Sequence, residues 1–141
     1  MIFKSGQYEG KTSEYVLLRH ANHAHHIMRK YPESPTAQEF RQLENRFDEK
    51  PLTAPCRACG TQATVASAFQ GNPNLMFWCS DCHPKNAANL MTITSFTDAM
   101  LHIDLTCNGV RSLKDAVIKV MAYAKGCPKR LTAAEAVAFL A

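Results

Sequence analysis

The sequence has no apolar run long enough to span a bilayer, and its opening stretch, MIFKSGQYEGK, lacks the apolar core of a secretory signal peptide. Internal repeats and low-complexity tracts are also missing. These absences argue against a membrane protein, a fibrous protein and a repeat protein. We therefore expect a cytoplasmic protein that makes no contact with a membrane.

The composition has no strong bias in charge or hydropathy. Apolar residues make up 46% of the 141-residue chain and charged residues 20%, which predicts a packed fold rather than a disordered chain. The formal net charge of +4 is compatible with a nucleic-acid partner but is too small to identify one.

Six cysteines are present in a chain with no sign of export. Cytoplasmic thiols stay reduced, so metal ligands and free thiols are favoured over disulfides. Cys79, Cys82 and His83 form a Cys-x-x-Cys-His string, which occurs both in c-type haem attachment and in zinc sites. A second pair, Cys56 and Cys59, comes earlier, and nineteen residues separate Cys59 from Cys79.

Two Cys-x-x-Cys pairs at this spacing are typical of zinc bound by four thiolates in a tetrahedron. We therefore favour one structural zinc ion over haem or a redox dithiol. Its expected ligands are Cys56, Cys59, Cys79 and Cys82. His83 is an alternative ligand in place of one cysteine. Four thiolates leave no coordination position for water, which favours a structural role over a catalytic one.

The residues between the two pairs predict a β-hairpin. The stretch 61–69 is rich in Thr, Val and Ala, 75–78 is apolar and aromatic, and QGNPN between them is a turn signal. The arrangement is that of a zinc ribbon, or of a treble clef if a helix begins after Cys82 with Pro84 in its first turn. So small a hairpin has little core, so the metal should supply much of its folding energy.

The N-terminal part predicts a hairpin around Ser5-Gly6 that closes at Gly10, followed by three helices. The first helix runs from Ser13 to about Arg19 after a Thr12 cap, and the second from about Asn22 to Tyr31. A capping box of Thr36 and Glu39 is expected to open the third. Its buried stripe should consist of Phe40, Leu43 and Phe47.

The C-terminal part predicts three more helices. Ser95 caps one that runs through Cys107, Ser112 and Asp115 begin the next, which ends at Gly126, and Thr132 with Glu135 opens the last. Cys107 and Cys127 have no partner at ligand spacing and should be small buried side chains. The expected fold class is α+β and helix-rich, with an N-terminal hairpin, a zinc-ribbon or treble-clef hairpin and C-terminal helices. Its expected segments are 1–50, 51–92 and 93–141, packed together as one compact protein.

The N-terminal segment carries Gly6, Tyr8, Gly10, Lys11 and Thr12 in a Gly-x-Tyr-x-Gly-Lys-Thr turn, followed by two short helices. This segment resembles the exodeoxyribonuclease X C-terminal-like domain over about thirty residues. That domain accompanies DNA-processing enzymes as an accessory part. The resemblance implies a nucleic-acid setting and supplies no catalytic residues.

Two groups of basic residues could bind phosphate. The string RHANHAHH places His23 and His26 three positions apart on one helix, where a metal or a phosphate could be bound, although a solvated helix face is the favoured account. A denser group surrounds the turn AKGCPKRLT and the helix before it, where Lys114 and Lys119 are expected to be exposed. Its members are Lys114, Lys119, Lys125, Lys129 and Arg130.

Two functions are compatible with these features. The first is a non-enzymatic, zinc-stabilised module that binds DNA or RNA, or a subunit of a DNA- or RNA-processing complex. The alternative is an adaptor that binds a partner protein and makes no contact with nucleic acid. An enzyme is disfavoured because no nucleophile–base pair, open metal site or carboxylate cluster is recognisable.

Overall fold

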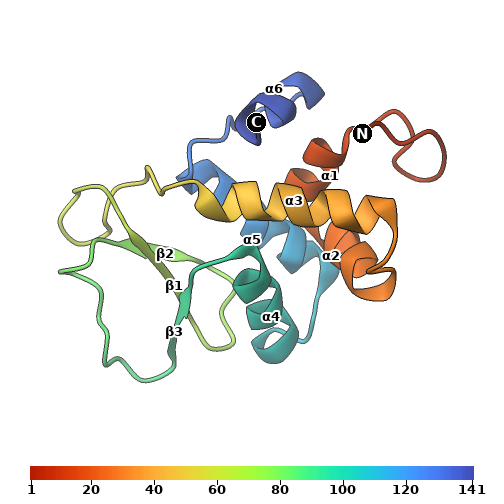
Figure 1. The fold of residues 1–141 in the computed structure, drawn as a ribbon. Coiled ribbons are helices and arrows are strands. Elements are labelled where there is room, and N and C mark those ends of the chain that lie inside the picture. Colours follow the sequence, from red (N-terminus) through yellow and green to blue (C-terminus); the bar gives the residue numbers. More distant parts are fainter.

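A computed structural model describes residues 1–141 as six helices and one three-stranded antiparallel sheet. The helices gather on one side of the molecule and the sheet, with its long loops, projects from the other (Figure 1). The α+β, helix-rich fold class predicted from the sequence is confirmed. In chain order the elements are α1 (Ser13–Arg19), α2 (Ala21–Lys30), α3 (Pro35–Glu49), β1 (Val65–Phe69), β2 (Met76–Trp78), β3 (Leu90–Ile93), α4 (Phe96–Thr106), α5 (Arg111–Ala124) and α6 (Ala133–Phe139).

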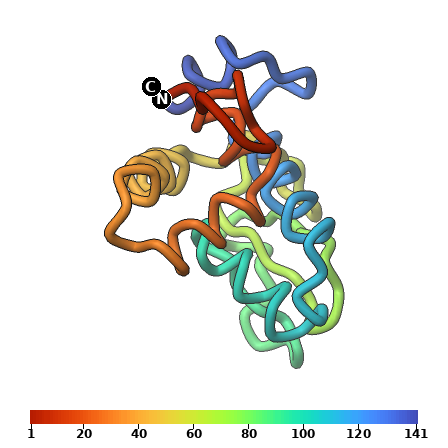
Figure 2. The backbone as a smooth tube through the Cα atoms, turned by 90° about the vertical axis from the view of Figure 1, so that its right-hand side faces the viewer, coloured from red at the N-terminus to blue at the C-terminus, as the bar shows by residue number.

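The N-terminal hairpin forms as predicted. The amide of Phe3 donates to the carbonyl of Lys11 at 3.0 Å, and the amide of Gly10 donates to the carbonyl of Phe3 at 2.8 Å. Gly10 has a φ of 80°, a left-handed conformation that glycine adopts without strain. Thr12 then caps α1, because its hydroxyl oxygen accepts from the amide of Tyr15 at 3.2 Å. Both ends of the chain lie on the same side of the molecule (Figure 2).

Helix α3 begins earlier than the capping box predicted. Ser34 is the cap, since its hydroxyl oxygen accepts from the amide of Ala37 at 3.1 Å, and Pro35 is the first helical residue. Proline suits that position because its fixed φ matches a helix and its missing N–H has no helical acceptor there. The predicted buried stripe is confirmed: Phe40 and Phe47 are fully buried, and Leu43 nearly so.

Helices α4 and α6 begin at the predicted caps, whereas α5 does not. The hydroxyl oxygen of Ser95 accepts from the amide of Asp98, and that of Thr132 from the amide of Glu135, each at 3.1 Å. Helix α5 has no side-chain cap. Asp115, expected in its first turn as a capping partner, instead accepts a hydrogen bond at 2.9 Å from the amide of Asn22 in α2. The Asp115 carboxylate therefore connects α5 to α2 and does not cap α5.

The sheet contains the predicted hairpin and one further strand. Strand order is β2-β1-β3, with Val65 opposite Trp78 and Ala68 opposite Met91. Residues 80–89 form turns that lead into β3, so the helix considered after Cys82 is absent and the treble-clef alternative is wrong. The third strand pairs the second edge of β1, which would otherwise leave buried backbone groups unpaired.

One hydrophobic core joins the helices to the sheet. Its 24 residues come from all six helices, from β1 and β3, and from the turns after α4, α5 and α6. Between positions 51 and 92 only Ala68 belongs to it. Most of the sheet unit therefore lies outside the main core and depends on other interactions. No helix is both long and apolar enough to cross a bilayer.

Candidate functional site

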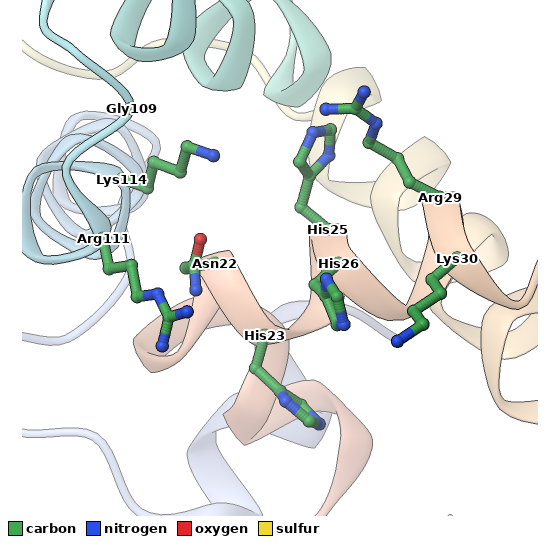
Figure 3. Close-up of a pocket in the computed structure, with 9 residues that line it drawn as sticks. All are labelled: Asn22, His23, His25, His26, Arg29, Lys30, Gly109, Arg111 and Lys114. Atoms are coloured by element: carbon green, nitrogen blue, oxygen red, sulfur yellow. The ribbon is translucent and has the colours of Figure 1, made fainter.

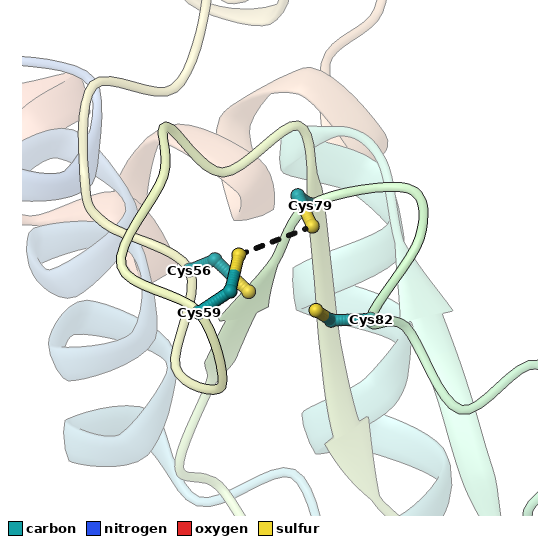
Figure 4. Close-up of side chains that lie close together, drawn as sticks. All are labelled: Cys56, Cys59, Cys79 and Cys82. Carbon is teal, nitrogen blue, oxygen red and sulfur yellow. Dashed lines mark hydrogen bonds between the residues drawn. The ribbon is translucent and has the colours of Figure 1, made fainter.

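The antiparallel pairing of β1 with β2 brings the two cysteine pairs together. Cys56 and Cys59 precede β1, and Cys79 and Cys82 follow β2. Because Val65 at the start of β1 pairs with the last residue of β2, both loops lie at the same end of the hairpin. Figure 4 shows the four side chains converging from these two loops.

The sulfur positions fit a tetrahedral metal site. All four Sγ atoms lie within 4.8 Å of one another, and those of Cys59 and Cys79 are 3.6 Å apart. A tetrahedron with Zn–S bonds of about 2.3 Å has sulfur–sulfur edges of about 3.8 Å. The four thiols therefore lie near the spacing that a tetrahedral site requires. Gly60, with a φ of 78°, closes the first turn through its amide, which donates to the carbonyl of Cys56 at 3.0 Å.

Backbone amides around the cluster stabilise individual thiolates, whereas the closeness of the four sulfur atoms opposes the ionisation of all four. Burial raises the pKa of Cys56, but backbone amides of Cys59, Cys79 and Ala58 outweigh it and lower that pKa to about 6. The amide of Cys82 lowers the pKa of Cys79. Hydrogen bonding to Cys79 and to Cys59 raises the pKa of Cys82 to about 12. A bound cation would remove this conflict between neighbouring negative charges.

The other candidate ligands do not join the cluster. The ligand atoms that converge belong to four cysteines and do not include His83. Cys107 and Cys127 are 7% and 5% exposed within the hydrophobic core, as predicted. All four converging ligand groups are therefore thiols, and such a set is suited to a closed metal centre.

The five cations predicted as a phosphate-binding group do not share one surface. Lys114 and Lys125 are each only 8% exposed, and they lie at opposite ends of α5, about 16 Å apart along its axis. Lys114 was expected on the exposed side of α5, but it faces Asp104 of α4 and forms an ion pair with it at 2.6 Å. Lys125 donates to the carbonyls of Phe47 and Lys50 at 2.8 and 2.9 Å.

Lys125 therefore serves as a cap for α3, and its removal should destabilise the protein. Burial lowers the pKa of its ammonium, which nevertheless satisfies two carbonyls at the end of that helix. We expect Lys125→Met to lower the free energy of unfolding by about 2–3 kcal/mol, because both carbonyls lose their partner. Urea denaturation measures this. Lys119→Met, at an exposed position of α5, should be nearly neutral.

Two of the five cations, Lys119 and Lys129, lie near Tyr123, and Arg130 follows Lys129 in the sequence. Lys129 and Arg130 are exposed, and the ammonium of Lys119 lies 5.9 Å from the Tyr123 ring. Arg19 of α1 joins them, with its guanidinium 5.3 Å from the same ring and a hydrogen bond of 3.1 Å to the carbonyl of Lys129. We call Arg19, Lys119, Tyr123, Lys129 and Arg130 the Tyr123 surface. Arg19 is about one hundred residues from the others in sequence, so only the fold shows that it belongs to this surface.

A second group of cations forms a pocket between α2 and the beginning of α5 (Figure 3). The pocket has a volume of about 600 Å³, and neither an apolar nor an acidic side chain lines it. We call it the α2–α5 pocket. Its lining residues are Asn22, His23, His25, His26, Arg29, Lys30, Gly109, Arg111 and Lys114.

The histidines of α2 are not a uniformly solvated face. His26 is exposed, but His23 is half-buried, with its ring centroid 4.5 Å from that of Tyr8, and His25 is only 8% exposed. Burial lowers the pKa of His25 to about 4, and Lys114 and Arg29 act in the same direction. His25 is therefore neutral at neutral pH.

The sequence identified the histidine string but did not select His25, because its burial depends on helices that are distant in sequence and pack against α2. The thiol cluster and the α2–α5 pocket share no residue. No family model, curated protein or solved structure matches the chain.

Proposed function

We propose that the chain is a non-enzymatic nucleic-acid-binding module whose sheet is stabilised by one structural zinc ion. The α2–α5 pocket carries the proposal, because its lining contains four permanent cations and no carboxylate. The phosphodiester backbone of a nucleic acid is a partner for such a surface, and phosphate contacts supply essentially all of the affinity of non-specific nucleic-acid binding.

Zinc is the metal we propose for the thiol cluster. Four thiolates in a tetrahedron suit zinc or an iron–sulfur centre, and two Cys-x-x-Cys turns joined by a hairpin are the arrangement of a zinc ribbon. Cys56, Cys59, Cys79 and Cys82 would hold the ion, and bound zinc would link the two loops and supply folding energy to the sheet. A shell filled by four thiolates leaves no position for a substrate.

The N-terminal resemblance supports the same setting. The turn with Gly6, Tyr8 and Gly10 resembles the exodeoxyribonuclease X C-terminal-like domain, and Tyr8 packs against His20 and His23 beside the pocket. We infer that this segment helps to shape a binding surface. A place as one subunit of a DNA- or RNA-processing complex follows from the same proposal.

Salt dependence of binding tests the proposal. Each phosphate contact contributes nearly one unit to the slope of log affinity against log salt. We expect the double variant Arg29→Ala/Lys30→Ala to reduce this slope by about two units with zinc content unchanged. Fluorescence anisotropy with single-stranded DNA, duplex DNA and RNA at several salt concentrations measures it.

The matched comparison is Lys129→Ala/Arg130→Ala, which removes two exposed cations from the Tyr123 surface. An equal fall in slope would show that nucleic acid contacts both ends of α5. If the parent protein binds no nucleic acid even at low salt, or if neither double variant changes the slope, the proposal is wrong.

An adaptor remains the second candidate, because α4 presents apolar side chains to solvent. Leu101 and Leu105, one helical turn apart, are 42% and 75% exposed, and Val110 after the helix is 42% exposed. Such a stripe suits a partner protein. Binding to a partner protein that is insensitive to salt but lost in Leu105→Asp would favour this candidate.

A further inference from the structure

The α2–α5 pocket has a buried base and an exposed rim. Lys114 and His25, each 8% exposed, form its base, and Figure 3 shows their side chains extending into the space between α5 and α2. Arg29 and Arg111 are exposed at its rim. This depth distinguishes the pocket from a row of surface lysines.

His25 has a polar atom that nothing in the protein satisfies. Its Nε2 is buried and has no hydrogen-bond partner. Buried polar atoms in folded proteins are nearly always paired, and His25 lines both the α2–α5 pocket and a second pocket against α3 and α4. A ligand bound in the α2–α5 pocket would supply the acceptor that Nε2 lacks. A neutral imidazole can donate from Nε2 if the proton is on that nitrogen.

The beginning of α5 adds further donors at the same place. Gly109 and Arg111 line the pocket, α5 is 14 residues long, and no side chain caps it. The amides of Arg111 and Ser112 donate to no backbone or side-chain acceptor. Unpaired amides and the positive end of the helix dipole favour an anion.

The positive charge of the side chains that line the pocket exceeds the negative charge of the one carboxylate that forms ion pairs with them. Arg29, Lys30, Arg111 and Lys114 carry four positive charges, and Asp104 forms ion pairs with Lys114 at 2.6 Å and with Arg29 at 3.6 Å. An excess of three positive charges remains at the pocket. Asp115, nearby on α5, accepts a hydrogen bond from the amide of Asn22 and pairs with none of these cations.

We propose that the α2–α5 pocket binds the terminal phosphate monoester of a nucleic-acid strand, with His25, Lys114, Arg111 and the first amides of α5 as donors. This inference rests on the proposed function and specifies which part of the nucleic acid the pocket recognises. The base of the pocket receives the phosphate, and the rim contacts the backbone that leads away from it.

The geometry favours a strand end over an internal phosphate. An internal phosphodiester carries one negative charge and is esterified on two sides, so the chain must leave a pocket in two directions. A terminal monoester carries nearly two negative charges at neutral pH and presents three acceptor oxygens on one side. Both its charge and its single attachment suit a pocket with buried donors at the base.

The test compares oligonucleotides of one sequence that end in a 5′-phosphate, a 3′-phosphate or hydroxyl groups only. We expect the parent protein to bind one phosphorylated form about tenfold more tightly than the hydroxyl form, the effect of one or two additional charge-assisted hydrogen bonds. Fluorescence anisotropy at constant salt gives the affinities. Titration with inorganic phosphate, followed by the NMR signals of His25, tests the pocket alone.

The variants Arg111→Ala and His25→Leu should bring the affinity ratio close to one. His25→Leu should fold normally, because Nε2 has no partner in the protein to lose, and circular dichroism checks this. Lys119→Ala is the matched control, since it removes an exposed cation from the same helix outside the pocket. It should leave the ratio unchanged even if it weakens both affinities.

The outcomes separate the two proposals. Equal binding of all three oligonucleotides would overturn the terminal-phosphate inference and leave nucleic-acid binding intact. A preference that persists in both Arg111→Ala and His25→Leu would also overturn it, because the end would be bound elsewhere. If inorganic phosphate shifts the His25 signals but no oligonucleotide binds at low salt, the pocket takes a small phosphate compound and the proposed function fails.

Discussion

Replacing Cys59 or Cys82 by serine is expected to release the metal and unfold the sheet. Binding of structural zinc contributes about 10–16 kcal/mol in small zinc modules, more than a unit of this size gains from its own core. Here the segment 51–92 places only Ala68 in the main core, so little else holds the two loops together. The parent protein should contain one zinc ion per chain.

Elemental analysis and near-ultraviolet circular dichroism measure these effects. Cys107→Ala is the control, because Cys107 is buried at the end of α4 and belongs to the helical core instead of the thiol cluster. It should keep its zinc even if it loses some stability. Iron in place of zinc, or a folded sheet without any metal in freshly purified protein, would contradict the proposal.

Phe40→Ala should lower the free energy of unfolding by about 3–5 kcal/mol, the usual cost of deleting a buried aromatic ring. Phe40 is fully buried in α3, and its ring centroid lies 6.1 Å from that of Phe3 in the N-terminal hairpin. The side chain therefore joins the hairpin to the helices, and its loss leaves a cavity between them.

Urea denaturation measures the change. Phe69→Ala is the comparison, since that ring is 42% exposed at the end of β1 and should cost much less. A neutral result for Phe40→Ala would mean that the N-terminal hairpin and α1–α3 do not share one core.

Several local features could be read from the sequence because short-range interactions determine them. The beginning of α1 at Ser13 was predicted correctly, because the Thr12 hydroxyl oxygen accepts a hydrogen bond from the amide of Tyr15, three residues further on. The caps at Ser95 and Thr132 follow the same rule. The two Cys-x-x-Cys turns could be found because each needs only four consecutive residues, and the hairpin between them then brings the pairs together.

Long-range packing determined the remainder. β3 has no strong signal of its own and forms because β1 needs a partner on its second edge. A dense run of cations in the sequence suggested one surface, but a helix distributes such residues around and along its axis, so Lys114 and Lys125 became buried at opposite ends of α5. The α2–α5 pocket exists only because α5 packs against α2. The residues around His25 indicate a helix, but they do not show which of its faces distant segments will cover.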